Sequence, residues 1–299
     1  MVRRGRRTSQ TPRRTLKDTR VVVVMSGGGA KSAAHVGSMK ALEELGLKPA
    51  HFVGTSMGAV VAACFASGLT YDDVLRRVTA LTRSDVARPS PSLLLGPFAE
   101  SLLSEGPLRR TIAQLVPARE FADLRIPLTV TAVDIDSGDL EIFGSGGRDH
   151  VPVRDALYAS TALPVYYPPA EIGDRRYVDG GLRSVLPLDI AYQLEPDMVV
   201  AISVGPSFYA DVGKNGAGLS PMLRAHDRSM RIMMAEQTER EIARWSDADV
   251  PLIVVEPYHR QQATFDVAGA IGYLEEGYRA TMRAFTDTGR SGLPKRTSD

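Results

Sequence analysis

The chain has few of the residues and segments that crosslink a protein or anchor it in a membrane. It contains one cysteine, Cys64, so neither an internal disulfide nor a thiolate metal site is available. Its longest apolar run, residues 59–66, is far below the ~20 residues that span a bilayer. The apolar residues 21–25 are too few for the core of a signal peptide, which needs about 7–15 residues. We therefore expect a protein of a reducing compartment, the cytoplasm, without a membrane span.

A large excess of charge of one sign is also missing, but the N-terminus departs from this balance. The chain has 36 basic and 35 acidic residues and a formal net charge of +1. Residues 1–20 hold eight of the basic and one of the acidic residues, which leaves 28 basic against 34 acidic in the rest. We expect a disordered basic tail, which in most proteins is solvated and has no specific partner; peripheral contact with an anionic membrane is the alternative. No specific nucleic-acid partner is predicted.

The remaining composition is typical of a globular protein. Hydrophobic residues make up 43% of the chain and charged residues 24%, which excludes collagen, a coiled coil and wholesale disorder. At 299 residues the chain is long enough to bury a substantial core. We expect a single domain over residues 21–288, followed by a flexible C-terminal tail over residues 289–299.

Predicted strands alternate with predicted helices along this domain. Short β-branched or alternating runs predict strands, and apolar residues at helical spacing predict the helices between them. This alternation favours an α/β fold with a parallel or mixed sheet covered on both faces. The strands are expected at residues 21–25, 51–53, 128–134, 140–143, 198–204 and 251–255, and the helices at residues 33–45, 59–68, 155–160, 221–245 and 269–285.

The first candidate for chemistry is a Gly-x-Ser-x-Gly pattern formed by Gly54, Ser56 and Gly58. It lies between a predicted strand and a predicted buried helix, as in a nucleophile elbow, where a serine on a strained turn presents its hydroxyl outward. The amino end of the following helix favours the negative charge that develops during acyl transfer. By itself, such a pattern is more often only a turn.

The second candidate is the run Gly27, Gly28 and Gly29, which also follows a predicted strand. Backbone without side chains can approach a ligand closely and donate several N–H groups, as in an oxyanion hole. A nucleotide-binding loop does not fit, because a phosphate loop has glycine directly before its Lys-Ser pair and Ala30 stands there instead. A tight strand-to-helix turn remains the purely structural alternative.

A serine nucleophile needs a proton acceptor, and histidine is the usual one. In the chain order serine, acid, histidine, only His226 and His259 follow the acid candidate Asp179. Each has the sequence context of a surface histidine. A Ser-His-Asp triad nevertheless stays open as an alternative.

Asp179 is the stronger candidate for the acceptor. It is followed by Gly180 and Gly181, which leave room for another backbone to approach its carboxylate. A Ser-Asp dyad is chemically sound if the carboxylate can gain and lose a proton near neutral pH.

Three segments together resemble the patatin-like phospholipases in order and spacing. They are SGGGAKSAAHVGSMKALEELGL, GTSMGAVVAACFASG and YASTALPVYYPPAEIGDRRYVDGG. The resemblance implies a three-layer α/β/α fold with a central, mostly parallel sheet, and it makes residues 21–288 the catalytic domain. It further implies Ser56 as nucleophile, Asp179 as proton acceptor and the glycines 27–29 as oxyanion hole, with no metal or cofactor.

Two positions next to the glycine loop bear on this resemblance. Lys31 stands where the family commonly has Arg or Lys, and Ser32 replaces a glycine usual in the family. A serine is tolerated there unless the backbone needs a positive φ or very close packing.

The sequence therefore predicts a serine lipid acyl hydrolase of phospholipase A or lysophospholipase type, with a lipid or another acyl ester as its substrate. Two alternatives remain: a triad esterase of the α/β-hydrolase type, and a non-catalytic lipid- or partner-binding protein on the same fold. The loop-rich residues 71–120, with an apolar patch at Leu93, Leu94 and Leu95, are a candidate cover for the site. Tyr166 and Tyr167 suit either an acyl pocket or the core.

Overall fold

The computed structural model describes residues 19–206, 220–257 and 269–291. Its centre is an eight-stranded mixed sheet in the order β5-β6-β3-β2-β1-β7-β8, with β4 pairing on β3. The five strands from β3 to β8 in that order are mutually parallel, and β4, β5 and β6 join in antiparallel fashion. The strands are β1 Val21–Met25, β2 Pro49–Thr55, β3 Leu128–Asp134, β4 Leu140–Gly144, β5 Ala170–Ile172, β6 Arg175–Asp179, β7 Met198–Ile202 and β8 Leu252–Val255.

Alternate residues of the central strand β1 enter two separate cores. Val21, Val23 and Met25 pack into the larger core, whereas Val22 and Val24 pack into the smaller one on the other face. Every one of these side chains is buried, which is why β1 is continuously apolar rather than alternating with polar residues. The sheet is therefore the middle of three layers, as the sequence predicts.

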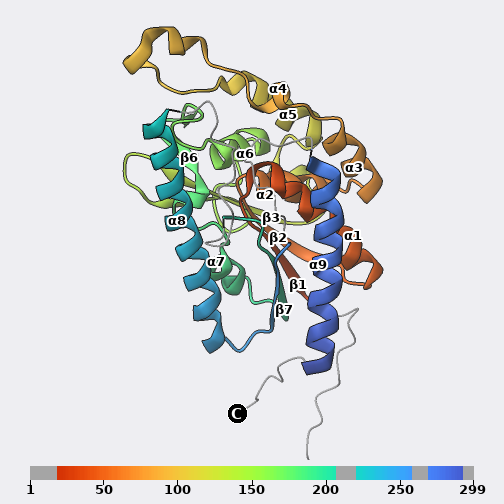
Figure 1. Ribbon diagram of the computed structural model, residues 1–299. Helices are drawn as coiled ribbons and strands as arrows, with labels where there is room; N and C mark the ends of the chain where they lie inside the picture. The colour runs from red at the N-terminus through yellow and green to blue at the C-terminus, as the bar shows by residue number, and fades with distance from the viewer. Residues whose placement is uncertain (1–18, 207–219, 258–268, 292–299) are drawn as a thin grey trace, which may run out of the picture.

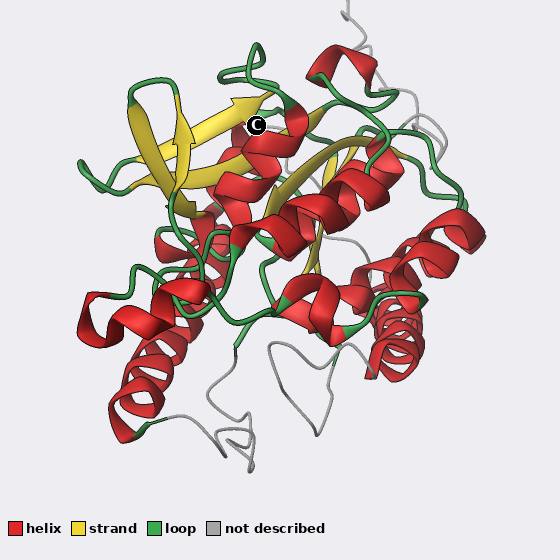
Figure 2. Cartoon of the chain, turned by 90° about the horizontal axis from the view of Figure 1, so that it is seen from above, coloured by secondary structure: helices red, strands yellow, loops and turns green. Residues whose placement is uncertain are grey.

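Helices cover both faces of the sheet (Figures 1 and 2). In Figure 1, α7 and α8 lie on one side of the strands, and α1, α2 and α9 lie on the other. Trp245 and Val250, which follow α8, fill the smaller core together with Leu188 of α7. The helices are α1 Ala33–Glu44, α2 Met57–Ala66, α3 Tyr71–Thr79, α4 Arg83–Val86, α5 Glu105–Leu115, α6 Val153–Thr161, α7 Leu188–Gln193, α8 Pro221–Arg244 and α9 Ala270–Ser291, with short 3-10 turns η2 Gly29–Ser32, η3 Pro91–Phe98, η4 Phe121–Asp123, η5 Gly180–Leu182 and η6 Trp245–Asp247.

Most elements expected from the sequence are present, with different bounds. The second strand is longer than expected and runs up to Thr55, and the helix after it begins at Met57 rather than at residue 59. The short elements β5, β6 and α7 were not expected, because three to six residues carry too little periodicity to reveal them.

The chain termini differ from the prediction in one respect. Helix α9 continues to Ser291, so residues 289–291 are helical rather than part of a flexible tail. Residues 292–299 lie outside the described residues, as do residues 1–18 of the predicted basic tail. In the part of the chain that the structure describes, no helix combines the length and the apolar character needed to cross a bilayer.

Candidate active site

Ser56 lies on the turn that joins β2 to α2. Its backbone has φ 55° and ψ −138°, a left-handed conformation that non-glycine residues rarely adopt. A serine held in this way at the carboxyl end of a parallel strand matches the predicted nucleophile elbow. The surrounding packing must keep the turn in this strained state.

Close packing explains the two glycines that flank Ser56. A β-carbon at Gly54 would lie 2.5 Å from Cα of Ala59, and one at Gly58 would lie 2.5 Å from the carbonyl oxygen of Met25. Any side chain at either position would push α2 away from the sheet. The Gly-x-Ser-x-Gly spacing is therefore a packing requirement of this turn.

Asp179 is the last residue of β6, and its carboxylate contacts Ser56 directly. The hydroxyl of Ser56 donates to Oδ2 of Asp179 at 2.6 Å. The other oxygen, Oδ1, accepts the N–H of Gly181 at 2.8 Å, which orients the carboxylate. A β-carbon at Gly180 would lie 2.6 Å from the carbonyl oxygen of Thr131 of β3, so the turn η5 that starts there is packed closely against the neighbouring strand.

The environment of Asp179 alters its acidity. The side chain is 4% exposed, and burial raises the pKa of its carboxyl to about 6. The hydrogen bonds from Ser56 and Gly181 oppose this shift because they stabilise the charged form. The carboxylate can therefore exchange a proton near neutral pH, as a general base needs to do.

The glycine loop after β1 lies against Ser56. A β-carbon at Gly27 would be 3.1 Å from Cβ of Ser56. The N–H of Gly27 donates to the carbonyl of Val185 at 3.2 Å, so this amide already has an acceptor. Gly28 and Gly29 follow at the start of η2 and line the same pocket as Ser56.

Lys31 and Ser32 also belong to this loop. The Lys31 side chain is buried, its Nζ donates to the carbonyl of Gly205 at 3.1 Å, and burial together with the charge of Arg231 lowers its pKa to about 8. Ser32 has φ −60°, a conformation open to any residue, so the backbone at this position does not require the glycine that is usual in the family.

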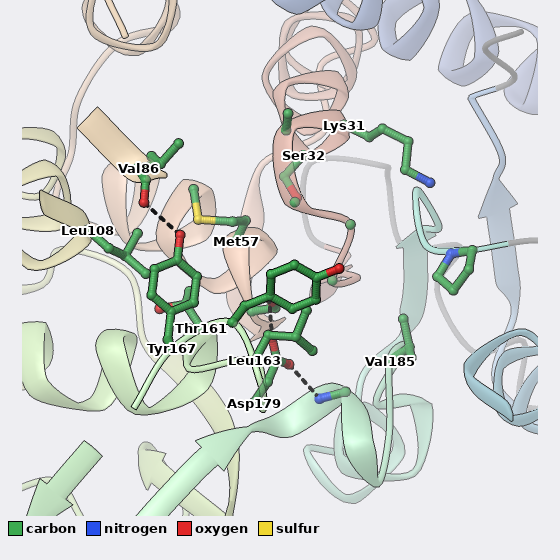
Figure 3. Close-up of a pocket in the computed structure, with 18 of the residues that line it drawn as sticks. Lys31, Ser32, Met57, Val86, Leu108, Thr161, Leu163, Tyr167, Asp179 and Val185 are labelled. Atoms are coloured by element: carbon green, nitrogen blue, oxygen red, sulfur yellow. Dashed lines mark hydrogen bonds between the residues drawn. The ribbon is translucent and has the colours of Figure 1, made fainter. Parts of the chain in front are cut away.

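The pocket that contains Ser56 and Asp179 has an extensive apolar wall. In Figure 3, Val86 and Leu108 lie on one side of Asp179 and Lys31 on the other. The hydroxyl of Tyr167 donates to the carbonyl of Val86, and this hydrogen bond joins two residues of the wall that are far apart in the sequence. The wall comprises Met57, Val78, Val86, Leu108, Leu115 and Tyr167, so the segment 71–120 does contribute to the site.

The histidines do not form a triad in the described part of the chain. His226 on α8 lines the pocket, but no described histidine is hydrogen-bonded to Ser56 or Asp179. His35 contacts the carbonyl of Ser26, and His51 contacts Thr129. His259 lies outside the described residues.

Sequence reasoning missed Ser160. Its side chain is fully buried in the last turn of α6, and its hydroxyl oxygen accepts the backbone N–H of Ser56. Ser160 lies 104 residues from Ser56 along the chain, so no local pattern links the two. A serine at the end of a predicted helix was the only signal that the sequence offered.

Fold and site together define an α/β protein in which an elbow serine is paired with a buried aspartate. The family model described as patatin-like phospholipase matches residues 23–192. This is more than half of the chain, and the chain belongs to the patatin-like phospholipase family.

Individual relatives align with this chain over only part of their own length. An uncharacterized NTE family protein of Mycobacterium tuberculosis is 30% identical over 213 residues, which are 69% of this chain and 56% of the relative. Patatin-like phospholipase domain-containing protein 6 of Homo sapiens is 29% identical over 207 residues, 69% of this chain and 15% of the relative. The chain thus spans about half, or much less, of the curated relatives that it matches.

Solved structures are similar at lower identity. The crystal structure of VipD from Legionella pneumophila aligns with 90% of this chain and 67% of its own, at 16% identity and a TM-score of 0.47. The type III effector protein ExoU aligns with 90% of this chain and 53% of its own, at 15% identity and a TM-score of 0.39.

Proposed function

We propose that this protein hydrolyses carboxylic esters of lipids, with Ser56 as nucleophile and Asp179 as general base. The observation that carries the proposal is the 2.6 Å hydrogen bond from the Ser56 hydroxyl to the buried carboxylate. It joins a nucleophile and a base without an intervening group. Membership of the patatin-like phospholipase family supports the same chemistry.

In the acylation step, Oγ of Ser56 attacks the ester carbonyl carbon while its proton passes to Oδ2 of Asp179. The tetrahedral intermediate then collapses, and Asp179 returns the proton to the departing alcohol oxygen. In deacylation, water attacks the acyl-serine and gives its proton to Asp179, which hands it back to Ser56 as the fatty acid leaves. Oδ1 stays bonded to Gly181 N–H throughout, so one carboxylate oxygen does all the proton transfer.

The oxyanion of each tetrahedral intermediate needs fixed donors. We assign this role to the N–H groups of Gly28 and Gly29, aided by the amino end of α2. Gly27 is predicted to shape the hole rather than donate, because its N–H is bonded to Val185.

The pocket lining suggests which substrate fits. An acyl chain suits the apolar wall that includes Val86, Leu108 and Tyr167. Arg231 lines the same pocket and is paired with Asp227 at 2.7 Å, so Lys31 is the cationic group that favours a substrate with an anionic phosphoester group. A phospholipid or lysophospholipid is the proposed class, since it combines both features. Contact of residues 1–20 with an anionic membrane, at the membrane's cytoplasmic face, stays a prediction.

An active-site fluorophosphonate tests the proposal directly. The intact mass of the wild-type protein is measured after treatment and compared with Ser56→Ala and Asp179→Asn, both checked for folding by circular dichroism. We expect a single adduct on the wild type, none on Ser56→Ala, and labelling of Asp179→Asn slowed by about a hundredfold or more. A folded wild type that remains unlabelled, with and without phospholipid vesicles, would favour the non-catalytic binding protein.

A further inference from the structure

The segment η3 exposes an unusual amount of apolar surface. Leu94 is 94% exposed, Phe98 is 86% exposed and Leu95 is 61% exposed. The segment reads PSLLLGPF and contains no charged residue. Residues 71–120 are the cover that the sequence predicts for the site, but the leucines of η3 are exposed to solvent and do not line the pocket. Exposed apolar clusters of this kind mark interaction surfaces.

This segment is the tip of an arm formed by residues 87–103. The two sides of the arm meet at an isolated bridge between Pro89 and Leu103, and the N–H of Ser90 donates to the carbonyl of Leu102. Figure 1 shows the arm projecting at one end of the molecule, the end at which α8 begins. The apolar tip is therefore held away from the body of the protein.

The base of the arm is attached to the rim of the active-site pocket. The N–H groups of Leu102 and Leu103 donate to the carbonyls of Val165 and Tyr166, next to the pocket-lining Pro164. The other end of the arm follows Val86, which lines the pocket and accepts the Tyr167 hydroxyl. Whatever binds the tip is thus brought to the rim of the pocket.

Charged side chains flank the uncharged tip. Arg88 is exposed at the base of the arm, and Glu100 is exposed two residues after Phe98. An uncharged apolar tip flanked by charged side chains matches the layering of a bilayer, in which acyl chains lie beneath polar headgroups.

We propose that η3 is a membrane-docking element, which inserts Leu94, Leu95 and Phe98 into a phospholipid surface and so sets the pocket rim against the bilayer. This inference rests on the proposed function in one respect: a lipid esterase needs a surface that contacts the membrane. It is independent of the basic N-terminal tail.

Vesicle flotation of the full chain tests this docking. The Ser56→Ala protein is used, so that hydrolysis does not alter the vesicles, which contain phosphatidylcholine and phosphatidylglycerol. High salt screens the contribution of exposed charges, including the tail. Adding Leu94→Ser and Phe98→Ser is expected to lower the partition coefficient by about tenfold or more at high salt, because the apolar area available for insertion is lost.

A matched control removes the same number of exposed apolar side chains elsewhere. Ile232 and Met233 on α8 are 50% and 57% exposed, and their double serine variant is expected to bind within about twofold of the parent. Equal binding by the tip variant, or an equal loss in the control, overturns the proposal. It is also overturned if the parent protein ignores vesicles but elutes as a dimer that the tip substitutions dissociate, since a second copy would then cover the tip.

Labelling by the fluorophosphonate separates this proposal from the proposed function. With Ser56 restored, the tip variant in vesicle-free solution should react as fast as the wild type, because η3 does not line the pocket. If Ser56 is unreactive in a protein that still binds vesicles through η3, the proposed hydrolase activity is refuted and the proposed membrane docking is retained.

Discussion

The hydroxyl oxygen of Ser160 accepts the backbone N–H of Ser56 at 2.8 Å. Two residues further along, the carbonyl of Ala162 accepts the N–H of Asp179 at 3.1 Å. The end of α6 therefore holds the backbones of both members of the proposed dyad. The short Ser56 to Asp179 contact depends on this shared support, because the two residues come from different strands of the sheet.

Loss of the Ser160 hydroxyl should impair the site without unfolding the protein. In Ser160→Ala the N–H of Ser56 loses its buried acceptor, at a cost of about 1–3 kcal/mol. We expect the rate of fluorophosphonate labelling to fall about tenfold or more. The matched control is Ser38→Ala, which removes another buried serine hydroxyl, bonded to Gly277 between α1 and α9. That variant should lose stability but keep its labelling rate, and equal rates in both variants would refute the positioning role.

Activity should decline as the pH falls through about 6. Below that pH the Asp179 carboxyl is protonated and cannot accept the Ser56 proton. The labelling rate, measured at several pH values, should drop about tenfold for each further pH unit. Glu241 is the control, because burial raises its pKa to about 7. The Glu241→Gln variant should show the same fall near pH 6; loss of that fall would assign it to Glu241 instead.

Asp179→Asn should make the folded protein more stable at neutral pH while slowing its chemistry. The folded-state pKa of about 6 exceeds the ordinary value of 3.8, so ionisation of this carboxyl weakens the fold as pH rises through that interval. The difference corresponds to about 2–3 kcal/mol of unfolding free energy above pH 6. Calorimetry should show Tm higher by ~5 °C at pH 8, with the gain disappearing near pH 4. A gain that is the same at both pH values would contradict this account.

A methyl group on Gly28 should disturb the proposed oxyanion hole. A β-carbon there would lie 2.7 Å from Cγ2 and 2.9 Å from the carbonyl oxygen of Val204, so the loop must shift. We expect Gly28→Ala to reduce kcat on a phospholipid ester by about a hundredfold, in line with loss of an oxyanion donor. Gly46→Ala serves as control, since Gly46 has φ +74° and open space around it. The control should lower Tm and leave kcat unchanged.

Substitution of His226 distinguishes the dyad from the triad. His226 lines the pocket from α8 but is not bonded to Ser56 or Asp179 among the described contacts. In His226→Gln we expect labelling and ester turnover within about threefold of the wild type, whereas loss of a general base costs about a hundredfold or more. His259→Gln should behave in the same way. A collapse of turnover in either variant would restore the triad.

Much of the architecture was predictable because it depends on local patterns. The β-branched run of β1, the apolar helix α2 and the glycines around Ser56 each report on the burial or close packing of neighbouring residues. Five consecutive residues made residue 56 a candidate nucleophile, since a strained turn before a helix needs small flanking residues. The three-layer arrangement followed from alternating strands and helices.

The tertiary structure decided what depends on residues far apart in the chain. Asp179 lies 123 positions after Ser56, and only the pairing of β6 with β3 brings its carboxylate within 2.6 Å of the serine hydroxyl. Burial of that carboxylate, and therefore its raised pKa, is a property of the assembled site. The engagement of the Gly27 amide by Val185 and the exposure of Leu94 likewise follow from packing. Sequence thus determined which groups are available, and long-range packing determined which of them meet and in what charge state.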